Sequence, residues 1–140
     1  MHSFELTTLI AAPPHKVFAA ITEPAQISRW DYCRWVQNDM CLQGKVRKRD
    51  EEGRLIEGEI VLYDPPSRFG LVVPLWVNAD DPDEGTFTTR QEFSIDTHEE
   101  KSVLTVKMEG FPSEDLCTRE RNSWGGYFLE KLKKVAEQQA

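Results

Sequence analysis

Hydrophobic and polar residues alternate over much of the first 110 residues, a pattern that is typical of half-buried strands. In residues 3–10, for example, the apolar side chains fall on one face of an extended chain. Strands are predicted in six segments: residues 3–10, 44–49, 57–63, 68–76, 86–96 and 102–109. Within residues 57–63 the same period places Gly58, Ile60 and Leu62 together on one face.

Helices are predicted in three segments. Residues 15–21 follow a double proline, and proline suits the first turn of a helix because its missing N–H would be unpaired there. Thr22-Glu23-Pro24 ends this helix, and a second short helix is predicted over residues 25–29. The third helix begins after Ser113, a suitable N-cap, and spans about 25 residues, or roughly 37 Å. Its apolar stripe consists of Cys117, Trp124, Phe128, Leu132 and Val135.

The order of these elements is strand, two short helices, antiparallel meander and one long helix, which predicts an α+β domain. Residues 86–96 set a largely apolar row against a polar one, so the sheet has one face that must be covered. The long helix is available for this, but a helix about 10 Å across cannot fill the concave face of a strongly curved sheet. We therefore expect a gap between helix and sheet, closed at one end by the two short helices. Such a gap would be a mostly apolar pocket for a small molecule.

Composition limits the classes of partner. The 140 residues suit one domain spanning residues 1–140. The net charge of −7 argues against a nucleic-acid partner, because phosphate backbones are bound mainly by Lys and Arg. No apolar run approaches the ~20 residues that a membrane helix needs, so membrane insertion is not expected. No secretory leader opens the chain, and a cytoplasmic location is expected.

The sequence contains no motif with catalytic or metal-binding spacing, so we expect neither metal nor other cofactor, no catalytic residues, and a protein that is not an enzyme. Cys33, Cys41 and Cys117 match no CxxC spacing and are expected to be reduced thiols. The acidic residues within 80–84 do not match an EF-hand loop, and we expect a solvated loop there.

Candidate ligand-binding residues are those expected to face the gap between sheet and helix. Thirteen are predicted to line it: Trp30, Trp35, Phe69, Leu71, Val73, Phe87, Thr89, Gln91, Phe93, Val106, Met108, Trp124 and Phe128. Trp30 and Trp35 flank Tyr32, and these rings would form a lid, a docking patch for a partner, or ordinary packing of the short helices. Gln91 is polar among apolar neighbours, so its amide would either pair within the wall or orient a polar group of the ligand.

Two glycines follow Trp124 in the middle of the predicted long helix. Glycine costs about 1 kcal/mol relative to alanine in a helix interior, so Gly125 and Gly126 need a reason. One explanation is a close approach of the helix to the sheet. The other is a thin stretch of wall that leaves room for a ligand.

The run from Ile10 to Pro24 (IAAPPHKVFAAITEP), followed by Trp30, resembles the opening of the START-like (SRPBCC) superfamily, which has the helix-grip fold. Within it, the chain looks like the activator-of-heat-shock-protein-90-ATPase homologue family, over nearly its whole length. The similarity continues through Gly44, Gly53, Gly58-Glu59-Ile60, Asp64-Pro65-Pro66-Ser67-Arg68-Phe69 and Gly85-Thr86, and ends in Trp124, Leu129 and Leu132. The chain departs from the family pattern at Ser123, often a glycine, and at Tyr32-Cys33-Arg34-Trp35. Both departures lie where a ligand would enter or rest.

The resemblance implies a helix-grip fold, in which a curved antiparallel sheet wraps around a long C-terminal helix and two short helices follow the first strand. It is compatible with three functions, because similar folds host several. We favour binding of a small hydrophobic or amphipathic molecule in the cavity between sheet and helix. The first alternative is a co-chaperone-like module that interacts with heat-shock protein 90. The second is a polyketide cyclase-like enzyme, which would need polar side chains pointing inward, with Asp31, Arg34, Thr89 and Gln91 as candidates.

Overall fold

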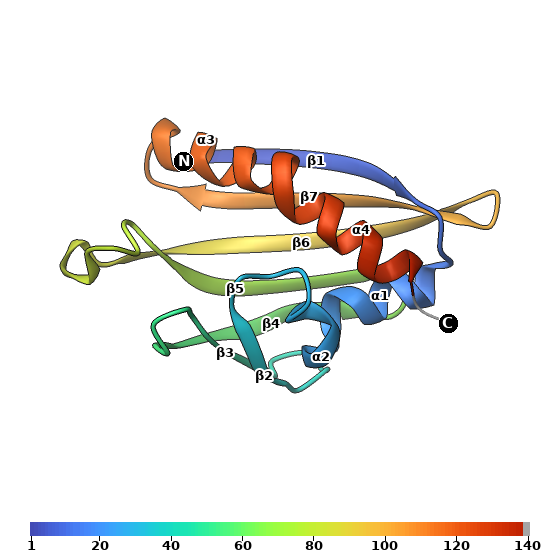
Figure 1. Ribbon diagram of the computed structural model, residues 1–140, viewed down its shortest axis with the longest axis horizontal. Coiled ribbons are helices and arrows are strands. Elements are labelled where there is room, and N and C mark those ends of the chain that lie inside the picture. The colour runs from blue at the N-terminus through green and yellow to red at the C-terminus, as the bar shows by residue number, and fades with distance from the viewer. Residues whose placement is uncertain (139–140) are drawn as a thin grey trace.

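In residues 1–138, which the computed structural model describes, seven antiparallel strands form one curved sheet (Figure 1). The order across the sheet is β1-β7-β6-β5-β4-β3-β2, so β2 to β7 form a meander of sequential strands and β1 pairs with β7. The strands are β1 (His2–Ile10), β2 (Arg34–Asn38), β3 (Lys45–Arg49), β4 (Leu55–Asp64), β5 (Arg68–Trp76), β6 (Thr86–His98) and β7 (Lys101–Phe111).

The helices lie on one face of this sheet. Two short helices, α1 (Pro14–Thr22) and α2 (Pro24–Ile27), follow β1, and a 3₁₀ turn, η1 (Pro82–Glu84), lies in the loop before β6. The C-terminal helix is built from α3 (Glu114–Ser123), the π-helical turn η2 (Trp124–Phe128) and α4 (Leu129–Glu137), which follow one another without a break. It crosses the sheet diagonally and packs against α1 (Figure 1). No helix within the described residues is long and apolar enough to span a membrane.

Local chemistry fixes where the helices begin. Pro14 occupies the first turn of α1, as the sequence predicts. Ser113 caps α3, because its hydroxyl oxygen accepts a hydrogen bond from the backbone N–H of Leu116 at 3.2 Å. Glu114 and Asp115 then place negative charge where the helix dipole favours it.

The strand β2 is not among the predicted strands. It is a short edge strand that pairs with β3, and its register shifts between Trp35 and Gln37. This irregularity breaks the alternation of apolar and polar residues, so period two carries no signal here. The strand matters because it brings Trp35 to the covered face of the sheet.

A second irregularity corrects the predicted faces of β4. The register against β5 shifts between Ile60 and Leu62, so the prediction that these two share a face is wrong. One extra residue in a strand moves every later side chain to the opposite face. Tyr63 therefore faces inward, and its ring lies 5.9 Å from that of Phe18.

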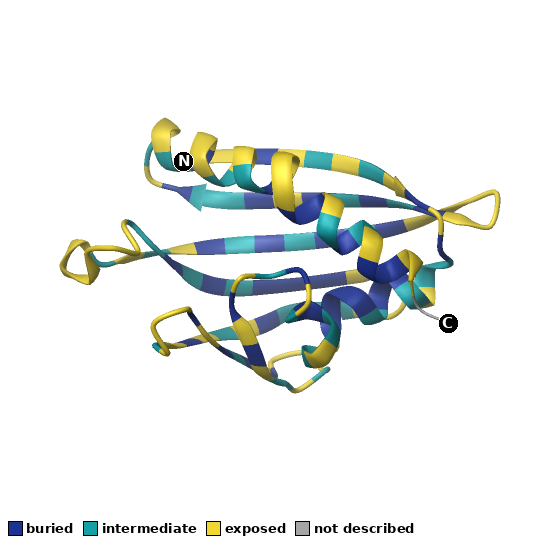
Figure 2. Ribbon diagram, in the orientation of Figure 1, coloured by how far each residue is buried: buried dark blue, intermediate teal, exposed yellow. Residues whose placement is uncertain are grey.

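The apolar core lies between the sheet and the helices (Figure 2). Buried and less buried residues alternate along β5, β6 and β7, and the buried set faces the C-terminal helix. The predicted α+β helix-grip fold is confirmed.

Candidate ligand-binding cavity

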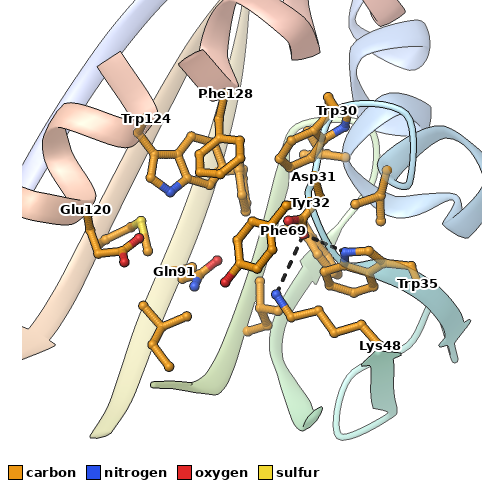
Figure 3. Close-up of a pocket in the computed structure, with 16 residues that line it drawn as sticks. Trp30, Asp31, Tyr32, Trp35, Lys48, Phe69, Gln91, Glu120, Trp124 and Phe128 are labelled. Atoms are coloured by element: carbon orange, nitrogen blue, oxygen red, sulfur yellow. Dashed lines mark hydrogen bonds and ion pairs between the residues drawn. The ribbon is translucent and has the colours of Figure 1, made fainter. Parts of the chain in front are cut away.

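A small cavity lies between the sheet and the C-terminal helix, bordered on one side by α1, α2 and the segment that follows them (Figure 3). Its sixteen lining residues come from both short helices, from residues 28–33, from five strands and from the C-terminal helix. About 40 Å³ is open to the centres of water-sized molecules, which is room for a few waters. A larger molecule therefore needs a side chain of the wall to move.

Aromatic rings form much of this wall, with Trp124 at their centre. Its ring centroid lies 5.6 Å from that of Trp30 and 5.9 Å from that of Phe93. Phe128 contacts it at 5.4 Å. Trp30 is held in place by its indole N–H, which donates to the carbonyl oxygen of Ala20 at 2.8 Å. Tilted aromatic pairs of this kind contribute about 0.5–1.5 kcal/mol each beyond their area burial, so these contacts help to hold Trp124 in place.

Trp124 and Phe128 reach the cavity from the π-helical turn η2. The backbone N–H of Leu129 donates to the carbonyl oxygen of Trp124, five residues earlier. Both explanations that the sequence offered for the glycines in this turn are wrong. A Cβ at Gly126 would meet no atom within 4 Å, and one at Gly125 would make an ordinary contact. Both glycines are exposed and neither lines the cavity; the contact of Gly125 would be with Leu6 of β1, 3.8 Å away, which is no closer than ordinary packing.

An ion pair lies in the wall. The ammonium nitrogen of Lys48 is 3.6 Å from Oδ2 of Asp31, and the two side chains are 8% and 10% exposed. Asp31 also accepts hydrogen bonds from the indole N–H of Trp35 at 2.8 Å and from the backbone N–H of Cys33 at 3.2 Å. Burial disfavours the charged ammonium, but Asp31, with Cys33 and Glu120, outweighs it and holds the pKa of Lys48 above its usual value. Lys48 is therefore a buried cation.

Two further polar groups face the cavity. Burial raises the pKa of Glu120, and the guanidinium of Arg119, 3.1 Å away, only partly offsets the shift. The amide nitrogen of Gln91 donates to the hydroxyl of Thr89 at 3.3 Å, and that hydroxyl donates to the carbonyl oxygen of Val73 at 2.9 Å. This chain fixes the nitrogen of Gln91, and its amide oxygen points toward the cavity (Figure 3). The site is apolar with one polar cluster, an arrangement that fits a mostly apolar molecule carrying a polar group.

Nine of the thirteen residues predicted to face the gap lie in the cavity wall: Trp30, Trp35, Phe69, Leu71, Gln91, Phe93, Met108, Trp124 and Phe128. The other four lie outside it. Val73 and Val106 face the same side of the sheet but are packed solidly, at 1% and 0% exposure. Thr89 is bonded to the backbone of β5, and Phe87 packs against Phe111 at 5.7 Å, near the start of α3.

Of the four polar residues that an enzyme would need to point inward, two line the cavity and two do not. Asp31 and Gln91 line the cavity, whereas Arg34 is exposed and Thr89 is buried in the sheet. Tyr32, which the sequence placed in a lid, a docking patch or ordinary packing, is one of the lining residues.

Sequence reasoning missed two charged lining residues, Lys48 and Glu120. Both had a signal. Lys48 lies two positions after Val46 on β3, so the two share the inner face. Glu120 lies three residues after Cys117 and four before Trp124, on the apolar stripe of the helix. Residue type alone gives no reason to expect either side chain inside, because Lys and Glu are seldom fully buried unless paired.

Other titratable groups assemble no second site. Within residues 1–138, no three His, Cys, Asp or Glu side chains are grouped so that they could hold a metal ion. Cys33 and Cys117 are buried free thiols and Cys41 is an exposed one. Burial raises the pKa of the Cys33 thiol to about 11, so it stays protonated near neutral pH. The acidic residues within 80–84 lie in an exposed loop.

Comparisons with known proteins agree with this architecture. A family model described as "Activator of Hsp90 ATPase homolog 1-like protein" matches residues 11–137. The comparison with curated proteins finds no match.

Several solved structures share this fold at low sequence identity. Protein MLL2253 from Mesorhizobium loti is 18% identical with a TM-score of 0.80, over 99% of both chains. PFC0360w, an HSP90 activator from Plasmodium falciparum, is 19% identical with a TM-score of 0.73, over 96% of both. CalU16 from Micromonospora echinospora is 20% identical with a TM-score of 0.72, over 97% of this chain and 76% of that one. At these identities the similarity establishes the fold and no more.

Proposed function

The chain belongs to the Activator of Hsp90 ATPase homolog 1-like protein family, and we propose that it binds a small hydrophobic or amphipathic molecule between the sheet and the C-terminal helix. The observation that carries this proposal is the cavity, whose aromatic walls surround one cluster of polar groups. The apolar part of the ligand would contact Trp30, Trp124 and Phe128. Its polar group would meet Lys48 and Gln91.

Tryptophan fluorescence tests this proposal directly. Three of the four tryptophans, Trp30, Trp35 and Trp124, line the cavity, whereas Trp76 does not. Titration with fatty acids, sterols and small aromatic compounds should give a saturable change in emission for at least one class. Native mass spectrometry of protein purified from its own host should detect a bound molecule. No change with any of these compounds, together with no co-purified molecule, would contradict the proposal.

A matched pair of variants separates binding in the cavity from binding elsewhere. Leu75 lines the cavity and is 8% exposed, whereas Leu55 is 45% exposed at the start of β4. Leu75→Phe should fill the cavity and weaken binding, and Leu55→Phe should leave binding unchanged. Equal effects of the two substitutions would place the ligand outside the cavity.

A second candidate function is docking on Hsp90. It is favoured by the description of the family and by the likeness in fold to the HSP90 activator from Plasmodium falciparum. A pull-down with Hsp90 and an assay of its ATPase test it, and Leu75→Phe should leave both unchanged if docking uses the outer surface. Absence of both binding and stimulation would contradict this candidate.

A further inference from the structure

The phenol ring of Tyr32 lies where the ring of a ligand would be expected. Tyr32 belongs to the segment between α2 and β2, and its ring stacks on Phe128 with centroids 6.0 Å apart and planes 29° apart. Figure 3 shows this ring pointing into the cavity, toward the side where Lys48 and Gln91 lie. Tyr32 thus contributes an aromatic ring and a hydroxyl to the centre of the site.

The two ends of the Tyr32 side chain differ in their exposure to solvent. The residue as a whole is 47% exposed, yet burial raises the pKa of its hydroxyl, and Cys33, Asp31 and Glu120 raise it further. Figure 3 shows the hydroxyl end pointing into the cavity, so this end is the sheltered one, and it remains protonated at neutral pH. Because the side chain starts at the surface and points inward, its rotation would move the ring out of the cavity.

The backbone around Tyr32 is held independently of its ring. The backbone N–H of Cys33 donates to Asp31, and that of Trp35 donates to the hydroxyl of Ser28 at 2.9 Å. Rotation of the Tyr32 side chain alone would vacate the space beside Phe128 without disturbing these bonds.

We propose that the cavity binds a small phenol-like aromatic molecule, whose ring displaces that of Tyr32 from Phe128 and whose hydroxyl takes the place of the Tyr32 hydroxyl. This inference rests on the proposed function and names the chemical class of its ligand. The Tyr32 side chain is 4-methylphenol attached to the chain, so the cavity wall already surrounds this chemistry.

The charges of the wall favour a neutral hydroxyl over a carboxylate. Two carboxyl groups, Asp31 and Glu120, and one ammonium, Lys48, face the cavity. An anionic ligand would meet like charges in a desolvated site, which costs free energy. A hydroxyl can accept from Lys48 and donate to Glu120 or to the amide oxygen of Gln91, whereas a purely apolar ring would form none of these additional hydrogen bonds.

The test compares Tyr32→Ala with wild type and with Tyr127→Ala as matched control. Tyr127 is 51% exposed and its ring lies 5.3 Å from that of Phe128, but it does not line the cavity. Calorimetric titration would use 4-methylphenol, toluene and 4-methylbenzoate. We expect Tyr32→Ala to bind 4-methylphenol about tenfold more tightly than wild type or Tyr127→Ala does, and about tenfold more tightly than it binds toluene. Tyr32→Ala should bind 4-methylbenzoate less tightly than it binds 4-methylphenol.

Each contrary outcome has a distinct meaning. Equal affinity of Tyr32→Ala for toluene and 4-methylphenol, or tighter binding of 4-methylbenzoate, would overturn the phenol class while leaving ligand binding intact. Equal affinity of wild type and Tyr32→Ala for 4-methylphenol would overturn displacement of the ring. Failure of both proteins to bind any aromatic or apolar probe would count against the proposed function itself. Tyr32→Phe keeps the ring and serves if the alanine variant does not fold; 4-methylphenol should bind it more tightly than wild type, and equal affinity would again overturn the proposal.

Discussion

Folding buries the carboxyl group of Glu120, and burial disfavours its charged form. Because burial raises its pKa, its stabilising contribution is complete below the pKa of the unfolded chain and is lost as the pH rises through the folded pKa. Glu120→Gln removes this dependence. We expect the variant to be more stable than wild type at pH 7–8, by less than about 1 kcal/mol, and equally stable below about pH 4. Urea unfolding at a series of pH values measures this difference.

A control for this experiment lies on the same helix. Glu130 is exposed on α4, and Glu130→Gln should change the free energy of unfolding little at any pH. A stabilisation by Glu120→Gln that grows as the pH falls would contradict the sign derived from burial.

Single residues also show what the sequence can and cannot predict about the site. Leu71 and Val73 lie two positions apart on β5, so period two correctly assigns both to the inner face. Leu71 borders the cavity and Val73 does not. That difference depends on where the C-terminal helix and Tyr32 reach across the sheet, which is a matter of tertiary packing that no pattern within one strand records.

At the scale of elements, the C-terminal helix contains a glycine whose replacement should stabilise the protein. Gly126 sits on the exposed side of η2, where an added Cβ would meet no atom within 4 Å. Alanine restricts the unfolded chain more than glycine does and favours the helix. We expect Gly126→Ala to raise the free energy of unfolding by about 0.5–1 kcal/mol, as measured by urea unfolding.

A glycine in the sheet provides the opposite case. A Cβ at Gly58 would lie 2.6 Å from the carbonyl oxygen of Val72, so Gly58→Ala should destabilise the protein. Destabilisation by Gly126→Ala as well would mean that the π-helical turn itself requires glycine.

The elements differ in how well the sequence predicts them. The long regular strands and the capped helix were predictable because their apolar positions repeat with one fixed period. The strand β2 and the bulge in β4 were not, because each contains a shift of register that interrupts the period. In the sequence, the only sign of the turn η2 is its two glycines, and two adjacent glycines are compatible with several other backbone conformations.

Over the whole molecule, aromatic side chains fill the space between helix and sheet unevenly. Near the start of α3, the ring of Phe111 lies 5.7 Å from that of Phe4 and 5.7 Å from that of Phe87, in a solid cluster. At the other end, Phe93 and Phe128 border the cavity. The mismatch between one helix and a curved sheet predicted a hollow, and large rings reduce its enclosed part to the small cavity beside the half-exposed Tyr32.

This unevenness leads to a comparison of two phenylalanines. Phe111 is fully buried in the solid cluster, so Phe111→Ala should cost about 3–5 kcal/mol of unfolding free energy, because the neighbours cannot collapse into the space. Phe128 is 8% exposed and contacts Tyr32, whose ring can move toward the vacated volume, so Phe128→Ala should cost about 1–3 kcal/mol. Urea unfolding of the two variants measures the difference. Equal costs would mean that the cavity end is as rigid as the solid end, and a wall that cannot adapt in this way could not admit a ligand larger than the few waters it now has room for.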